Sequence, residues 1–367
     1  MRMKNKLWLA LILAGSAVTT LPAVAQQKIR ITAPADQPYR FKHSGLTIPV
    51  TLEDMPRVGI DQFGTEELDV FANYERGREA LTVYVYRNVS GAVPVWFDRA
   101  KASIEQRRDA YGDATVALAP TAFTPPGQNV ASGLMGAWSV SKPPYRGTAL
   151  VLLPLGDDWL VKIRYSSATL DGAAVAARLP AILAALTWPT GLAAAAPAQP
   201  IADCATPLAF PKKAKIVRDQ EALSMSALLG GVLQSAAANS AKEQKASGKA
   251  AESKPPLWCR DPGPSPIGGV YRADAATDAY LLAFSDAGRG ASVSPDTLGT
   301  MLDKKGAPRW SVSLIDMAQS STYPPFTALP RPAEVLAMIQ QPALSQASTW
   351  GERTQINLNA GAFGSKR

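Results

Sequence analysis

Residues 68–86 read LDVFANYERGREALTVYVY, and this stretch decides the fold class. Apolar and polar side chains alternate on both sides of Glu75-Arg76-Gly77-Arg78, a pattern typical of two half-buried strands joined by a tight turn. Val and Tyr dominate the second arm, and both residue types favour strands. The sequence therefore predicts a β-hairpin with arms at Leu68–Tyr74 and Leu81–Tyr86.

Two helices and further strands are predicted around this hairpin. Pro94 suits the first turn of a helix. The residues that follow it at helical spacing are Trp96, Phe97, Ala100, Ile104 and Tyr111. Asp171 is a good N-cap for a second helix over 172–186, in which Pro180 predicts a kink or a late start. Strands are expected at residues 28–32, 46–52, 115–118, 136–140, 147–153 and 159–165. We expect an α+β domain over residues 26–190, an antiparallel sheet packed with two helices.

Three segments of this half carry a likeness to known families: LTVYVY at 81–86, WLVKIR at 159–164 and ILAALTW at 182–188. With the order of strands, helix, antiparallel meander and closing helix, this half resembles the PsbP-like and DcrB-like families of exported domains. The likeness consists of packing patterns and includes no reactive motif. It implies a binding or accessory role and transfers no site residues.

The second half is predicted to form a separate small unit. Residues 191–203 are an Ala- and Pro-rich linker, and residues 204–367 are expected to form a mixed α/β domain. Its predicted elements are a helix over 221–235, strands at 269–272, 279–284, 310–316 and 355–358, and a helix from Pro332 to Gln340. Residues 236–256 form a tract of Ala, Lys, Glu and Ser without aromatic residues. Such a tract buries little apolar surface, so a mobile insertion is predicted.

The N-terminus has the features of an export signal. Arg2, Lys4 and Lys6 precede an apolar stretch over 7–18, and Ala23-Val24-Ala25 offers small residues for cleavage before Gln26. A retained membrane anchor is the alternative, but about 12 apolar residues are too few to span a bilayer, which needs roughly 20. We therefore predict a signal peptide over residues 1–25, a periplasmic or extracellular location, and no membrane span after cleavage.

The two cysteines, Cys204 and Cys259, both lie in the exported part. In an oxidising compartment such a pair favours one disulfide, with two unpaired thiols as the alternative. Two cysteines so far apart do not make a zinc site. No metal and no cofactor are expected.

The chain has a single histidine, His43, next to Lys42. This excludes two-histidine metal sites and any Ser-His-Asp triad away from position 43, and a lone His in this setting is usually a surface residue. The 38 basic and 30 acidic residues give a net charge of +8, but the basic residues are scattered. Nucleic-acid binding needs a clustered basic surface, so it is not expected.

One segment is a candidate for protein contacts. Tyr323-Pro324-Pro325-Phe326 follows a predicted strand, and its prolines would order a loop that displays two aromatic rings. Rigid aromatic side chains are common anchors at interfaces. The alternative is a loop packed against its own domain.

These features predict an exported, non-enzymatic binding or accessory protein of the bacterial envelope. One alternative is an envelope hydrolase that uses two carboxylates in a cleft. Another is a subunit of an envelope assembly or secretion complex, with envelope proteins as partners. The oligomeric state is left open.

Overall fold

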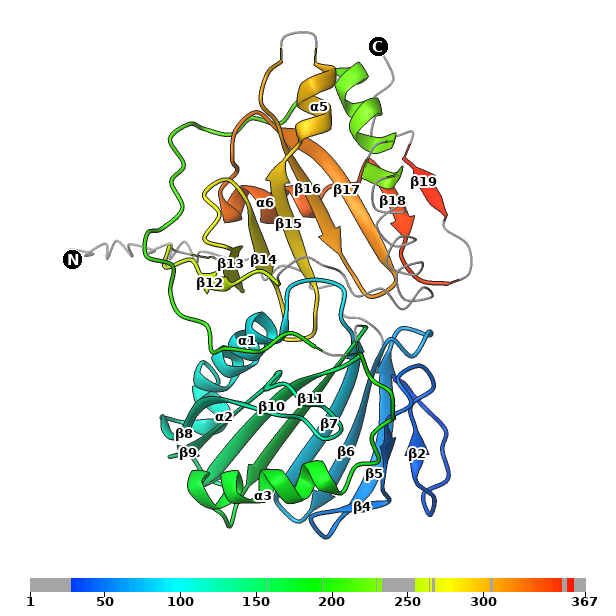
Figure 1. Cartoon of the computed structure of the whole chain (residues 1–367), viewed down its shortest axis with the longest axis vertical. Coiled ribbons are helices and arrows are strands. Elements are labelled where there is room, and N and C mark those ends of the chain that lie inside the picture. Colours follow the sequence, from blue (N-terminus) through cyan, green and yellow to red (C-terminus); the bar gives the residue numbers. More distant parts are fainter. Residues whose placement is uncertain are drawn as a thin grey trace, which may run out of the picture.

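The computed structural model describes residues 28–156, 158–193, 195–228, 230–232, 255–263, 265, 268–303, 306–351 and 355–359. The predicted signal peptide (1–25) and residues 236–254 of the predicted insertion lie outside the described residues. Two antiparallel sheets account for most of the structure, with few helices, which confirms the α+β class (Figure 1). Among the described helices, none combines the length and apolar character needed to cross a membrane.

The first sheet contains the predicted hairpin. β6 (Asp69–Arg76) pairs with β7 (Glu79–Arg87), and the turn lies at Gly77, as predicted. The strand order is β1-β5-β6-β7-β11-β10-β9-β8, and every neighbouring pair is antiparallel. The other strands are β1 (Lys28–Arg30), β5 (Met55–Phe63), β8 (Ala114–Phe123), β9 (Gly133–Val140), β10 (Gly147–Leu155) and β11 (Trp159–Ser167). The short strand β4 (Thr51–Leu52) pairs with β5, and β2 (Tyr39–Arg40) pairs with β3 (Thr47–Ile48).

Two helices cover opposite faces of the first sheet. A Cβ at Gly136 would lie 3.5 Å from the Phe97 ring of α1 (Val93–Glu105), whereas a Cβ at Gly147 would lie 2.5 Å from the backbone of Asp171 at the start of α3 (Gly172–Ala184). Gly136 pairs with Leu150, three residues from Gly147 on β10, so the two glycines face opposite sides. The short helix α2 (Arg108–Tyr111) follows α1.

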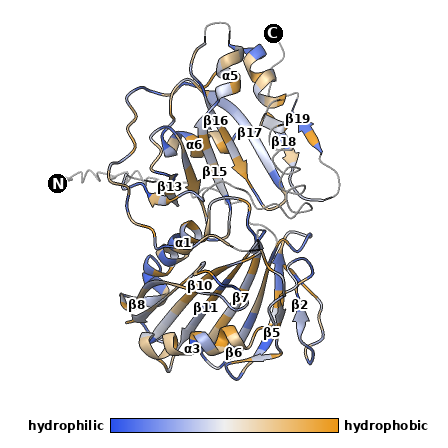
Figure 2. Cartoon of the chain, in the orientation of Figure 1, coloured by the Kyte–Doolittle hydropathy of each residue, from blue (hydrophilic) through white to orange (hydrophobic). Residues whose placement is uncertain are grey.

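Both helix predictions are confirmed in their main features. The predicted apolar residues Trp96, Phe97, Ala100 and Ile104 are buried in α1, whereas Tyr111, predicted in the same helix, is buried in the separate helix α2. The Asp171 side chain accepts a hydrogen bond from the Ala174 amide at 2.9 Å. The helix α3 begins at Gly172 and contains Pro180, so the late start considered from the sequence is wrong. Its mostly apolar character is visible in Figure 2.

The second sheet is an antiparallel meander, so the mixed α/β prediction for this half is wrong. Its strands follow in chain order: β12 (Trp258–Arg260), β13 (Gly269–Ala273), β14 (Tyr280–Ala283), β15 (Gly290–Pro295), β16 (Trp310–Ile315), β17 (Gln319–Phe326), β18 (Ser345–Ser348) and β19 (Ile356–Leu358). Parallel neighbours need crossover connections of a dozen residues or more, and most of the connections here are shorter. The helices of this half are α5 (Thr297–Leu302), α6 (Pro332–Ile339) and a helix over 220–232, of which residue 229 is not described.

The core continues from the first sheet into the second. Tyr271, Leu281, Ala283 and Met317 belong to the same buried cluster as the strands and helices of the first sheet. Beneath α6, the opposite face of the second sheet forms its own cluster, with Val270, Leu282, Val293, Val312 and Tyr323. The two sheets are therefore packed together, and the proposed boundary at 191–203 stays a prediction.

Candidate functional site

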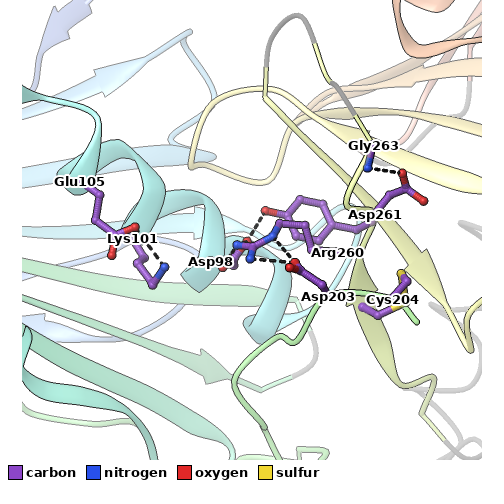
Figure 3. A network of polar contacts seen from close by, with 10 residues as sticks. Asp98, Lys101, Glu105, Asp203, Cys204, Arg260, Asp261 and Gly263 are labelled. Carbon is purple, nitrogen blue, oxygen red and sulfur yellow. Dashed lines mark hydrogen bonds and ion pairs between the residues drawn. A yellow bond between two sulfur atoms is a disulfide. The ribbon is translucent and has the colours of Figure 1, made fainter. Parts of the chain in front are cut away.

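The polar contacts between α1 and the second sheet centre on Asp98. Arg260 Nη1 lies 3.1 Å and 3.2 Å from the two Asp98 carboxylate oxygens (Figure 3). The Tyr271 hydroxyl donates to Asp98 Oδ2 at 2.8 Å. Arg260 also contacts Asp203 at 2.8 Å, beside Cys204. Burial and the charge of Asp98 raise the pKa of Tyr271, so its hydroxyl stays protonated and donates. These contacts join α1 to the disulfide-bonded edge of the second sheet.

A second contact between the sheets buries a lysine. Lys162 projects from β11, and its Nζ lies 3.0 Å from Asp286 Oδ1 and 4.4 Å from the centre of the Tyr84 ring. Asp286 belongs to the 284–289 loop between β14 and β15. Burial lowers the pKa of Lys162, and the Asp286 charge opposes this shift. Burial alone would raise the pKa of Asp286, but Lys162 and Arg164 together hold it below its ordinary value.

The same loop makes a third contact through Arg289. Its Nη1 lies 3.0 Å from Asp69 Oδ2 on β6, and its Nε lies 2.7 Å from Asp316 Oδ1. Burial raises the pKa of Asp69, and the Arg289 charge counters this. Nearby, Arg87 of β7 donates to the Met317 carbonyl at 2.6 Å. These ionised groups neutralise one another between two packed surfaces. Ion pairs that only stabilise the fold shift pKa values in the same way as the charged groups of active sites. We interpret this cluster as a structural contact that holds the two sheets together.

We expect the contribution of Asp286 to stability to depend on pH. Because its pKa is lower in the folded than in the unfolded protein, Asp286 adds stability above its unfolded pKa of about 4, and that stability is lost as the pH falls further. Asp286→Asn should therefore lower the free energy of unfolding at neutral pH, and its difference from the wild type should shrink below pH of about 4. Urea denaturation across this range measures the difference. Asp36→Asn, at an exposed position, is the control and should leave the free energy of unfolding at neutral pH nearly unchanged.

A pocket of about 310 Å³ opens over the second sheet, away from these ion pairs. Strands β15, β16 and β17 contribute its floor, and the 220–232 helix and the start of α5 contribute its sides. The lining residues are Ser226, Gly230, Ser294, Pro295, Asp296, Thr297, Leu298, Ser311, Ser313, Thr322, Tyr323 and Pro325.

The floor carries hydroxyls because of strand alternation. Ser292-Val293-Ser294 in β15 pairs with Ser311-Val312-Ser313 in β16, and Ser313 pairs in turn with Thr322 in β17. Successive residues of a strand point to opposite faces. The valines therefore enter the core beneath α6, and the hydroxyl side chains lie on the pocket face.

The 220–232 helix lies directly on this floor. Ser345 Oγ donates to the Ala227 carbonyl at 2.9 Å, and a Cβ at Gly230 would lie 2.5 Å from Thr322 Oγ1, so glycine permits the close approach. The Ser226 Oγ of this helix is buried without a hydrogen-bond partner. A buried hydroxyl of this kind costs free energy unless it is paired.

The pocket lining combines hydroxyl side chains with apolar surface. Six of the lining residues, from Ser226 to Thr322, have hydroxyl side chains, and a hydroxyl can both donate and accept a hydrogen bond. Among the described lining residues Asp296 is the one that carries a carboxylate, and its Oδ1 accepts from the Gly299 amide at 2.8 Å.

The Tyr323-Pro324-Pro325-Phe326 segment was predicted to be an exposed loop. In the structure it forms the end of β17 instead. Tyr323 and Phe326 are 5% and 3% exposed, and the Tyr323 hydroxyl donates to the Ile339 carbonyl. A register shift between β16 and β17 beside the prolines explains how the strand tolerates them. Tyr323 and Pro325 line the pocket. Their role in protein contacts stays a prediction.

The predicted disulfide is confirmed, with the Sγ atoms of Cys204 and Cys259 2.08 Å apart. His43 is partly buried: its ring centre lies 5.8 Å from that of Trp159 and 5.0 Å from that of Trp350. Within the described part of the chain, no three His, Cys, Asp or Glu side chains are grouped as metal ligands would be.

Sequence reasoning missed the hydroxyls of the pocket floor. The strand β15, between Gly290 and Pro295, was not predicted, so the serines around Val293 had no assigned face. The repeated Ser-Val-Ser pattern at 292–294 and 311–313 is the signal that could have revealed two paired strands with one polar face.

Comparisons with protein-family models, with curated proteins and with solved structures found no match to this chain. The likeness of the first half to PsbP-like and DcrB-like domains therefore stays a prediction.

Proposed function

We propose that the chain is an exported, non-enzymatic binding module of the bacterial envelope whose ligand occupies the pocket on the second sheet. The observation that carries this proposal is the set of hydroxyl side chains that lines the pocket, among them Ser294, Ser311 and Thr322. The Cys204–Cys259 disulfide fits an oxidising compartment.

The walls of the pocket support binding because they are held in place before a ligand arrives. Asp296 caps α5, and Ser345 fastens the 220–232 helix to the sheet. A preformed site loses less conformational freedom on binding than a mobile one. The hydrolase alternative needs a second carboxylate facing Asp296, and the described lining residues include one carboxylate.

A thermal-shift screen of protein recovered from the periplasmic or secreted fraction tests the proposal. Uncharged polar, anionic, cationic and peptide compounds are compared, and a ligand at about 100 times its Kd stabilises the folded state by about 2.7 kcal/mol. We expect a hit whose stabilisation is lost in the double variant Ser294→Ala/Thr322→Val.

Ser292→Ala is the matched control, since Ser292 lies on the same strand and face as Ser294 but does not line the pocket. It should keep the full shift. A screen without hits, or hits that the double variant retains, would contradict the proposal.

A further inference from the structure

The small number of charged side chains among the described lining residues bears on the class of ligand that the pocket can bind. The described lining residues include no Lys, Arg or His, which are the side chains that recognise phosphate or carboxylate groups. The carboxylate of Asp296 is partly used in capping α5. Hard cations are held by several carboxylate and carbonyl oxygens, and one carboxylate does not supply such a set. The pocket therefore favours an uncharged ligand.

The hydroxyls of the floor form rows across the strands. Ser294 Oγ and Ser311 Oγ lie within hydrogen-bond distance of each other, 3.3 Å apart, and Ser311 Oγ also lies 3.2 Å from the Ser294 carbonyl oxygen. Thr322 lies opposite Ser313 on the next pair of strands. Neighbouring strands are about 4.8 Å apart, so hydroxyls recur across the floor at that interval. A ligand that itself carries several hydroxyls can pair with such a floor as donor and as acceptor.

Apolar side chains lie beside these hydroxyls. Pro295, Leu298 and Pro325 line the same pocket. Binding sites for small molecules combine apolar surface with a few placed polar groups. A sugar ring has C–H faces as well as hydroxyls at its rim. Its C–H faces can contact the proline and leucine side chains, and its hydroxyls can hydrogen-bond the Ser and Thr side chains.

A peptide fits the pocket less well. Extended peptides bind at sheet edges through main-chain hydrogen bonds, whereas the floor lies on strands already paired on both sides.

We infer that the pocket binds an uncharged saccharide through the hydroxyls of Ser311 and Thr322; this inference rests on the proposed function. The two hydroxyls come from neighbouring strands of the floor, and Ser226 of the 220–232 helix lines the same pocket. The ligand pairs with these two strand hydroxyls while its C–H surface contacts Leu298.

Isothermal titration calorimetry of the mature protein tests this inference. The probes are neutral tetrasaccharides of N-acetylglucosamine, of α-linked glucose and of β-linked glucose, with a tetrapeptide and inorganic phosphate as comparisons. We expect one tetrasaccharide to bind. Ser311→Ala and Thr322→Val should each weaken it roughly tenfold, as for one lost hydrogen bond.

Two controls accompany the titration. Ser292→Ala should bind as the wild type does, because Ser292 lies outside the pocket. Raising the salt concentration about tenfold should leave the affinity unchanged, because an uncharged ligand is not screened. Unchanged thermal midpoints of the variants would show that they remain folded.

Each contrary outcome has a distinct meaning. If the peptide or phosphate binds in a way that Thr322→Val abolishes, and no saccharide does, the saccharide inference is wrong and the proposed function stands. If a saccharide binds equally well to both pocket variants, its site lies elsewhere and the inference is wrong. If none of the probes binds, and the thermal-shift screen also finds no ligand, both are wrong.

Discussion

Replacing Lys162 by Met lowers the free energy of unfolding by about 3 kcal/mol, because it leaves the Asp286 carboxylate facing an apolar side chain between the two sheets. The Lys162 side chain is 2% exposed and that of Asp286 is 24% exposed, so water compensates poorly for the lost cation. Arg164 lies 4.0 Å from Asp286 and replaces only part of the attraction. Because Arg164 still interacts with Asp286, we expect a loss near the lower end of the roughly 3–5 kcal/mol typical of breaking a buried ion pair.

Urea denaturation of the wild type and of Lys162→Met measures this effect. The matched control is Lys101→Met, because the Lys101–Glu105 pair on α1 has the same 3.0 Å separation but is more exposed, at 23% and 37%. An exposed pair of this spacing contributes about 0.3–0.5 kcal/mol. The double variant Lys162→Met/Asp286→Asn should recover part of the loss, since it leaves no unpaired charge. Equal costs for the two lysine variants would show that the junction is not a buried ion pair in solution.

The double variant Cys204→Ser/Cys259→Ser is expected to lose about 4 kcal/mol of stability. The two cysteines are 55 residues apart in sequence, and the bond between them restricts the unfolded chain. The lost stability arises mainly from the greater conformational freedom of the unfolded chain, so the folded structure around positions 204 and 259 should persist. There Arg272 pairs with Asp261 at 3.4 Å, and the Cys204 amide donates to the Arg260 carbonyl at 2.8 Å.

Chemical reduction provides the control for this second prediction. Adding a thiol reductant to the wild type should reproduce the lower urea midpoint, whereas the double variant should not respond to the reductant. A loss below about 1 kcal/mol in both cases would mean that the unfolded chain is restricted by something other than the disulfide.

Elements with strong periodicity could be predicted from the sequence, and elements interrupted by proline or glycine could not. The hairpin of β6 and β7 and the helix α1 were found because their apolar residues repeat at strand and helix spacing over many residues. The strand β5 was missed because it contains Pro56 and Gly59. Gly59 lies where the pairing of β5 with β6 shifts register, and the Arg30 side chain covers it. The need for glycine at this position therefore depends on a residue of another strand, which local sequence patterns do not show.

The pocket depends still more on distant residues. Its hydroxyls come from the 220–232 helix and from β15, β16 and β17, and only the meander brings them to one face. Each serine taken alone is an ordinary polar residue of a loop or a strand. The unpaired Ser226 Oγ becomes visible only when the helix lies on the sheet.

By itself the sequence determined the α+β class, the central hairpin, the two helices of the first half and the pairing of the two cysteines, because each of these depends on local periodicity or on a single available partner. Tertiary structure alone decided the antiparallel order of the second sheet, the hydroxyl pocket and the burial of Lys162. In the WLVKIR segment, this lysine has the spacing of a solvent-facing residue on an alternating strand. It is buried because the 284–289 loop, more than a hundred residues later, places Asp286 against it.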